Sequence, residues 1–318
     1  MSIFRITIAT AAVAAFLVLP RLCSTARAQD VSSPCLTSCA ETRFIEAEGV
    51  HYAYRSFGVE DGVPLVFFQR FRGTMDEWDP ALTDVIASGR HVILFDNAGV
   101  ARSDGEASQT LTGWADTGAA FIAALGYHQV DVLGFSFGGL VAQELALRHP
   151  DLVRRLVIAG SGAGYVEGAN LNPKAVEVAT KPVNVDADFL YLFFKATPTS
   201  QAAGRAHLAR LKLRADAFEK LVSAPAWQAM LAAGGDVSTP ETSLLHRVGA
   251  IRQPVLVANG VEDIMIPTYQ SYALAQAIPN VRLVIYPDSG HGFLFQYGAA
   301  FGAEVLRFLK EDDVLAAN

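Results

Sequence analysis

The segment Gly134–Gly139 has the sequence GFSFGG and places Ser136 in a Gly-x-Ser-x-Gly pattern. An apolar run, Val130–Leu133, precedes it, and a helix-like segment reaching Arg148 follows. A serine at a sharp strand-to-helix turn exposes its hydroxyl, and the glycines let two chain segments approach closely. The helix N-terminus behind it offers N–H donors to a developing oxyanion. The pattern predicts a nucleophilic serine; the alternative interpretation is a tight glycine turn without chemistry.

A serine nucleophile needs a general base, and that base needs a carboxylate to orient it. His291 stands in a Ser-Gly-His-Gly sequence just after one strand-like run, and Asp263 follows another. Because the carboxyl ends of parallel strands lie at one edge of a sheet, we expect both side chains to reach Ser136. The neighbouring Glu262 is the main alternative to Asp263 as the orienting carboxylate.

The elements that must position these side chains alternate along the chain. Strand-like runs are short, apolar and bounded by Gly, Pro, Asp or Asn; they are residues 64–68, 91–95, 130–133, 152–158, 255–257 and 281–286. Helix-like segments lie between them, at residues 79–87, 111–125, 138–148, 269–277 and 299–310. This order predicts a parallel sheet covered by helices on both faces. The runs 43–47 and 51–57 look hairpin-like and are expected at the first edge.

The alternation stops between Ser161 and Ala250, where no strand pattern is visible. Helix-like segments are expected there at residues 172–180, 186–195, 200–213, 216–222 and 225–233, with Pro182, Pro198, Pro225 and Gly234-Gly235 as interruptions. We interpret this stretch as a helical insertion that lies over one end of the sheet.

The first 28 residues resemble a secretory signal peptide. Arg5 precedes a short apolar stretch, and Ala26-Arg27-Ala28 has the form of a cleavage site. The apolar stretch is shorter than the roughly 20 residues of a membrane helix, so no stable membrane anchor is expected after cleavage. Residues 29–42 would then form an N-terminal arm whose Cys35 and Cys39 can pair in an oxidising compartment. The predicted location is secreted or periplasmic.

Composition excludes several classes of protein. Hydrophobic residues make up 51% of the 318 residues and charged residues 18%, which is too apolar for intrinsic disorder. The formal net charge of −7 argues against a nucleic-acid partner. No phosphate-binding glycine motif and no cluster of metal ligands is visible, so neither a nucleotide cofactor nor a metal is predicted.

These motifs together resemble the α/β-hydrolase fold family, in its branch of serine esterases and cofactor-free haloperoxidases. The segment Asp96–Ser103 is similar to the family's Asp-x-x-Gly-x-Gly-x-Ser loop, with Ala101 where a glycine is usual. The resemblance implies a triad of Ser136, His291 and Asp263 and a mostly parallel sheet of eight strands. It also implies a core formed by residues 43–162 and 249–312, with a helical cap at residues 163–248.

The chain departs from the family's usual His-Gly pair after the third strand. Gln69 and Arg70 stand in those positions, and Arg72 follows closely. If the backbone path is kept, the resemblance implies an oxyanion hole made by the N–H groups of Phe71 and Phe137. For Arg70 and Arg72 we expect salt bridges with nearby acidic residues, and for Arg70 a partner close to Asp96; candidates are Asp96, Asp76 and Glu77. The alternative is recognition of a substrate carboxylate or carbonyl, which the arginine fork fits well.

The insertion carries a group of aromatic side chains that includes Phe189 and Phe193. They are candidate substrate contacts, although a helix packed on a core would show the same pattern. The main functional hypothesis is hydrolysis of a carboxylic ester or related acyl bond of a small molecule through an acyl-enzyme on Ser136. The alternatives are perhydrolase chemistry of the haloperoxidase type, and a ligand-binding protein that retains the triad. Acyl and alcohol preference and oligomeric state stay open.

Overall fold

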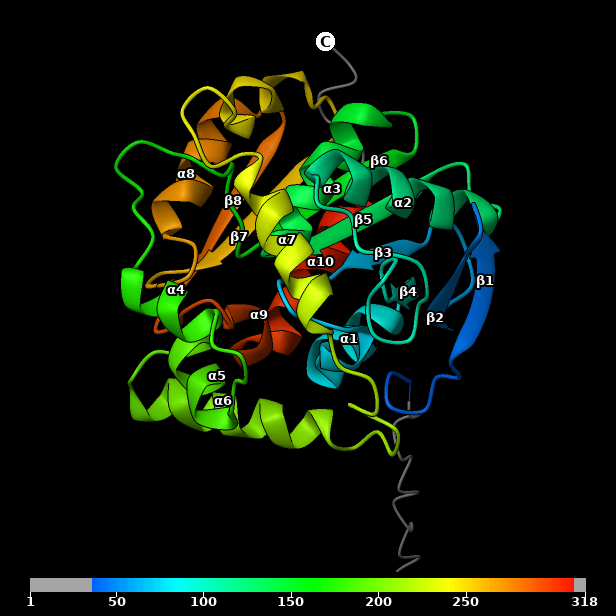
Figure 1. Ribbon diagram of the computed structural model, residues 1–318, viewed down its shortest axis with the longest axis horizontal. Coiled ribbons are helices and arrows are strands. Elements are labelled where there is room, and N and C mark those ends of the chain that lie inside the picture. The colour runs from blue at the N-terminus through cyan, green and yellow to red at the C-terminus, as the bar shows by residue number, and fades with distance from the viewer. Residues whose placement is uncertain (1–35, 312–318) are drawn as a thin grey trace, which may run out of the picture. The chain divides into compact units, whose positions relative to one another are not determined.

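The computed structural model describes residues 36–311 (Figure 1). Residues 1–28, where the sequence predicts a signal peptide, lie outside the described residues, as do Cys35 and residue 312. Cys39 is disulfide-bonded. None of the helices in the described part of the chain has the length and apolar character needed to cross a bilayer.

Eight strands form one sheet in the order β1-β2-β4-β3-β5-β6-β7-β8. They are β1 (Arg43–Ala47), β2 (Val50–Gly58), β3 (Leu65–Phe68), β4 (His91–Phe95), β5 (Val130–Phe135), β6 (Val153–Ala159), β7 (Val255–Gly260) and β8 (Val281–Tyr286). β2 pairs antiparallel with both β1 and β4, and the pairs from β4 to β8 are parallel. The predicted mostly parallel sheet with an antiparallel first edge is confirmed.

Alternating side chains of the central strands supply two cores. Val66 and Phe68 of β3 face one core, which α2 (Leu111–Ala124), α3 (Phe137–Arg148) and α8 (Thr268–Ala277) complete. Leu65 and Phe67 face the other, which α1 (Pro80–Ala87), α9 (Phe293–Gln296) and α10 (Gly298–Lys310) complete. Strands buried on both faces read as continuous apolar runs because neither face meets water.

Between β6 and β7 the chain forms helices α4 (Pro173–Ala179), α5 (Asp186–Phe193), α6 (Pro198–Leu211) and α7 (Ala224–Gly235). Figure 1 shows α4, α5 and α6 grouped together, and α6 lies against α9. Each begins after a residue in extended backbone, and proline occupies the first turn of α4, α6 and α7, where its missing N–H has no helical acceptor. We use the name cap helices for α4–α7 below.

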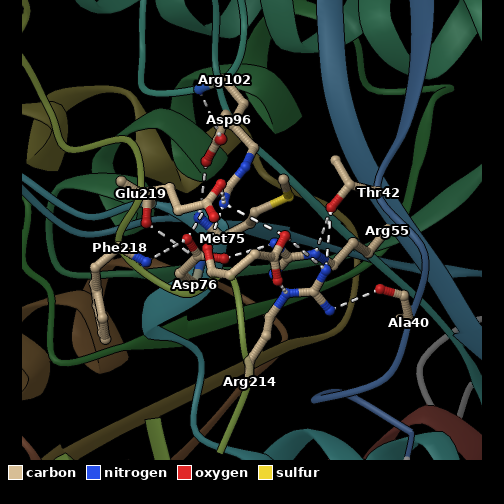
Figure 2. A network of polar contacts seen from close by, with 12 residues as sticks. Ala40, Thr42, Arg55, Met75, Asp76, Asp96, Arg102, Arg214, Phe218 and Glu219 are labelled. Atoms are coloured by element: carbon tan, nitrogen blue, oxygen red, sulfur yellow. Dashed lines mark hydrogen bonds and ion pairs between the residues drawn. The ribbon is translucent and has the colours of Figure 1, made fainter. Parts of the chain in front are cut away.

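The helix expected at residues 216–222 is absent from the structure, so that prediction was wrong. Phe218 has a positive φ of 64°, which a helix does not allow. Its backbone N–H donates to Asp76 Oδ2 at 3.0 Å, and Arg214 donates to the carbonyl of Ala40 at 2.7 Å (Figure 2). Contacts with distant parts of the chain therefore set this segment's conformation. The helix expected at residues 225–233 is α7, which includes the Gly234-Gly235 pair and ends at Gly235.

Candidate active site

Ser136 lies at the turn between β5 and α3 in a strained backbone conformation, with φ 55° and ψ −119°. The strain persists because the surrounding chain leaves no alternative. A Cβ on Gly138 would lie 2.1 Å from the carbonyl oxygen of Phe68, and one on Gly134 would lie 2.2 Å from that of Gly138. The Ser136 N–H donates to the carbonyl of Ala159 at 2.9 Å. Only glycines permit this approach of strand, turn and helix.

His291 and Asp263 meet behind the serine, at the carboxyl ends of β8 and β7. His291 Nδ1 lies 2.7 Å from Asp263 Oδ2, and both side chains are buried. Asp263 Oδ1 accepts the N–H groups of Met265 and Ile266 at 2.8 and 2.9 Å, which fixes the carboxylate. Glu262 points elsewhere and pairs with Lys195 Nζ at 2.6 Å. The geometry therefore favours Asp263 over Glu262 as the partner of the histidine.

The other ring nitrogen of His291, Nε2, is buried and has no hydrogen-bond partner among the described residues. An Nδ1–H donating to an ionised carboxylate leaves Nε2 with a free lone pair, which can accept a proton. Phe135 and Phe193 hold the ring, with centroids 4.9 and 5.1 Å away. The N–H of Gly292 donates to the Phe193 carbonyl at 2.7 Å, so α5 also fixes the histidine's loop.

The loop after β3 follows a tight path despite Arg70. The N–H of Arg70 donates to Gln69 Oε1 at 2.9 Å, and the N–H of Gly73 donates to the Arg70 carbonyl at 3.0 Å. Gln69 Nε2 donates to the Thr74 carbonyl at 2.5 Å, so the glutamine braces the turn from inside. Neither the N–H of Phe71 nor that of Phe137 donates a hydrogen bond within residues 36–311. Both residues line a cavity together with Ser136.

Arg70 pairs with Glu77, one of the three acidic candidates, through Nη2 and Oε1 at 2.5 Å. Burial raises the pKa of Glu77, and the arginine counteracts that rise. Glu77 also accepts the N–H of Thr74 at 2.6 Å in a capping box. Asp96 takes no part in holding Arg70, because it accepts backbone N–H groups of Met75 and Arg102. The expected salt bridge of Arg70 is therefore confirmed, and Glu77 is the partner among the three candidates.

Arg72 has no carboxylate partner within the described part of the chain. Its guanidinium donates to the carbonyls of Ala179, Lys181 and Pro182, at 3.4, 2.6 and 3.1 Å. It lies 5.1 Å from the ring centroid of Trp227 in α7. The expected salt bridge of Arg72 is therefore wrong: the side chain joins the loop after β3 to the cap helices through neutral groups.

Two cavities meet at Ser136. The larger, of about 500 Å³, is lined by Arg70, Arg72, Glu77 and His291 and by the candidate contacts Phe189 and Phe193. We call it the arginine cavity. The smaller, of about 380 Å³, is lined by apolar side chains such as Leu140, Val166 and Met230, and none of its described lining residues is charged. We call it the apolar cavity. Phe71, Ser136, Ala179 and Met265 line both cavities.

Two buried acidic residues lie at the centres of polar clusters that the sequence did not single out, and one of these clusters joins α6 to the core. Figure 2 shows Asp76 between Arg55 and Arg102, whose guanidinium nitrogens lie 2.6 Å from its two oxygens. Asp79 accepts Arg210 Nε and Nη2 at 2.7 and 2.6 Å, and its Oδ2 lies 2.7 Å from His207 Nδ1. Burial raises the pKa of the Asp79 carboxyl group, but Arg210 and His207 outweigh burial and hold this pKa below its usual value.

Two cavity residues were missed because nothing local marks them. Met265 lines both cavities, and its only sequence signal is its closeness to Asp263. Gln270 lines the apolar cavity from α8. It also holds the segment after β6 in place, because its Oε1 accepts the N–H of Ala163 at 3.1 Å and its Nε2 donates to Gly164 O at 2.8 Å. No group of three or more potential metal ligands occurs within residues 36–311.

Known proteins resemble this chain along most of its length. Residues 63–296 match the family described as the alpha/beta hydrolase fold. A 2-hydroxymuconate semialdehyde hydrolase of Pseudomonas putida is 32% identical, covering 71% of this chain and 79% of its own. A Mycobacterium tuberculosis protein whose name proposes non-heme bromoperoxidase activity is 29% identical, covering 81% and 97%. An alpha/beta hydrolase fold protein from Chitinophaga pinensis is 36% identical, with a TM-score of 0.81 and coverage of 87% and 99%. The chain belongs to the α/β-hydrolase fold family.

Proposed function

We propose that the protein is a serine hydrolase that cleaves a carboxylic ester or related acyl bond through an acyl-enzyme on Ser136. The observation that carries the proposal is the environment of His291. Its Nδ1 lies 2.7 Å from Asp263 Oδ2, and its buried Nε2, which has no partner among the described residues, lies beside the cavity that Ser136 lines. A histidine oriented by a carboxylate on one side and open on the other is the arrangement a general base needs.

The reaction uses the groups around Ser136 in turn. Ser136 Oγ attacks the substrate carbonyl carbon while His291 Nε2 takes the hydroxyl proton. The N–H groups of Phe71 and Phe137 donate to the oxygen that becomes negative, since neither has another acceptor in the part of the chain that the structure describes. The C–O bond to the leaving group then breaks, and Nε2 returns the proton to the leaving oxygen. Water, deprotonated by His291, releases the acid and restores Ser136.

Turnover of p-nitrophenyl esters of increasing acyl length by the full chain tests this proposal. We expect steady release of p-nitrophenol, and a loss of about 10⁴-fold or more in kcat/KM for Ser136→Ala. Ser161→Ala is the matched control, because Ser161 is buried beside the same turn but does not lie on it. Turnover by Ser136→Ala equal to that of the parent chain would contradict the mechanism. Binding without turnover would support a ligand-binding protein instead.

Perhydrolase activity is the second candidate, because the Mycobacterium tuberculosis relative carries the name of a bromoperoxidase. In that case hydrogen peroxide replaces water as the acceptor, and the acyl group on Ser136 leaves as a peracid. The measurement is peracid formed per acid formed when an ester is supplied with peroxide. A ratio that exceeds the spontaneous reaction and disappears in Ser136→Ala would favour this candidate.

We propose that the protein is exported, as the signal-like residues 1–28 suggest. Fractionation of cells that express the full chain tests this, together with the mass of the mature N-terminus. Cleavage after Ala28 is the expected result.

A further inference from the structure

The arginine cavity carries an uncompensated positive charge. Arg70 and Glu77 form an ion pair, so these two charges cancel. Within residues 36–311 the Arg72 guanidinium donates to backbone carbonyls alone, and these neutral groups leave its formal charge without a counter-charge. Asp186 and Lys212 at the rim lie 3.7 Å apart, and both are about two-thirds exposed, so they cancel each other and are screened by water. The interior of the cavity is left with one net positive charge, that of Arg72.

A polar atom in the same cavity lacks a partner. Arg70 is 8% exposed, and its Nε is buried without an acceptor in the part of the chain that the structure describes. The guanidinium carbon lies 5.4 and 5.1 Å from the ring centroids of Phe189 and Phe193, which hold it in place. A buried N–H without an acceptor is costly, and a ligand oxygen would remove that cost.

The pair of arginines therefore fits an anion. Arg70 and Arg72 both line this cavity, and a buried Nε–H of Arg70 is without an acceptor among the described residues. Partial burial lowers the pKa of Arg72, nearby Arg70 lowers it further, and Glu77 raises it. A single carboxylate would neutralise the excess charge and accept hydrogen bonds from the arginine forks. The apolar cavity offers no charged group among its described lining residues, so it suits the uncharged part of the same molecule.

The position of His291 decides which half of the substrate carries the carboxylate. His291 lines the arginine cavity and is absent from the lining of the apolar cavity. The leaving group must lie beside His291 Nε2 in order to receive its proton. The leaving half consequently occupies the arginine cavity, and the acyl half occupies the apolar cavity.

We propose that the substrate is an ester whose leaving half bears one carboxylate, bound by Arg72 and Arg70, and whose acyl half is apolar. This specificity rests on the proposed serine hydrolase function. Hydrolysis would release a hydroxy acid from the arginine cavity and an apolar carboxylic acid from the apolar cavity.

Two pairs of isosteric substrates test the proposal. In the first pair, hexanoyl glycolate and hexanoyl glycolamide, a carboxylate replaces a carboxamide on the leaving half. In the second, monomethyl adipate and its monoamide, the same change lies on the acyl half. We expect kcat/KM to favour the carboxylate by about tenfold or more in the first pair only. Equal rates in the first pair, or the carboxylate preferred only on the acyl half, would overturn the proposal.

Arg72→Gln should abolish the preference for the carboxylate, because KM should rise at least about tenfold more for hexanoyl glycolate than for hexanoyl glycolamide. Arg72→Lys should retain part of the preference for the carboxylate, because lysine keeps the positive charge. Arg205→Gln is the matched control, since Arg205 is an exposed arginine of α6 and its loss changes net charge equally. If Arg72→Gln changes both substrates equally, the side chain only joins the loop to the cap helices and the specificity is overturned.

A binding measurement tests the recognition of the carboxylate independently of the proposed hydrolase function. Calorimetry on the Ser136→Ala chain compares hexanoyl glycolate with hexanoyl glycolamide without turnover, so it also decides the matter if Arg72→Gln fails to fold. Tighter binding of the carboxylate by about tenfold supports the charge recognition even if no ester is ever cleaved. Equal binding, with glycolamide esters still hydrolysed by the unmodified chain, overturns the specificity and leaves the hydrolase function standing.

Discussion

The strand ends and the cap helices hold the active site by different physical means. At the strand ends the backbone conformation fixes the position of the reacting groups. Ser136 has a strained φ of 55°, and there is no room for a Cβ on Gly138 beside Phe68. The cap helices, in contrast, are held against the site by contacts between side chains and the rest of the chain. His207 and Arg210 of α6 bind Asp79 before α1, and Arg72 binds carbonyls that follow α4.

This difference explains why chemistry and specificity lie in different regions. A backbone-determined turn tolerates little change, so it keeps one serine in one place. Side-chain ion pairs and stacked rings, such as Phe189 on Phe193 at 4.0 Å, can be replaced without moving the sheet. The cap helices can therefore alter the cavity while the strand ends keep the reacting groups fixed.

The sharpest test of the strand-end geometry is the choice between two adjacent acids. Asp263→Asn should lower kcat by about 10⁴-fold, because an amide holds the histidine in the wrong tautomer. Glu262→Gln removes only the exposed pair with Lys195 and should change kcat by less than about twofold. Steady-state kinetics on one ester decide between them. The reverse ranking would make Glu262 the orienting carboxylate.

A pair of glycine substitutions compares the two regions directly. Gly138→Ala should unfold the turn or cost more than about 3 kcal/mol of unfolding free energy, because its Cβ would lie 2.1 Å from Phe68 O. Gly235→Ala, at the end of α7, meets nothing within 4 Å and should be neutral or stabilise by up to about 1 kcal/mol. Urea unfolding measures both. Similar losses in the two variants would show that the strand ends tolerate backbone change as well as the cap helices do.

The contacts of Asp79 with His207 and Arg210 predict a smaller loss of unfolding free energy than Gly138→Ala. Asp79→Asn should destabilise the protein by about 3 kcal/mol, since it leaves buried His207 and Arg210 without their carboxylate. The loss lies at the lower end of the usual range because Arg210 is 30% exposed and regains water. Asp186→Asn, at an exposed carboxylate, serves as the control and should change stability by less than about 0.5 kcal/mol. An equal and small effect of both changes would show that Asp79 does not anchor α6.

The last prediction concerns the pH dependence of stability at Asp96, because burial raises the pKa of its carboxyl group from 3.8 to about 7. Between these two values the folded state binds more protons than the unfolded state, so stability falls as pH rises from about 4 to about 7. Asp96→Asn should flatten this slope, measured as urea midpoints at pH 5 and 8 against the exposed control Asp61→Asn. An unchanged slope would mean that Asp96 does not titrate in this range.

The sequence predicted the strands and the helices of the core well because their signals are local. The runs at residues 91–95 and 281–286 match β4 and β8, since an apolar run bounded by turn residues needs little context. The segment 216–222 was mistaken for a helix because Asp76, which binds Phe218 N–H, lies 142 positions away in sequence. A local pattern carries no information about such a partner.

The same limit applies to the candidate site. Ser136, Asp263 and His291 could be named because each follows a strand and stands in a recognisable sequence. The pairing of Arg70 with Glu77 was one of three candidates, and residue types alone could not choose among them. Asp79 and His207 lie 128 positions apart and gave no signal until the fold joined them.

The most direct test of Ser136 as the nucleophile is the mass of a covalent adduct. The full chain is incubated with a fluorophosphonate, digested, and the peptide that spans the turn between β5 and α3 is sequenced by mass spectrometry. We expect one adduct per chain, on Ser136. The adduct should be absent from Ser136→Ala, and it should form more slowly on Asp263→Asn. An adduct on another serine, or full labelling of Ser136→Ala, would contradict the assignment of Ser136 as the nucleophile.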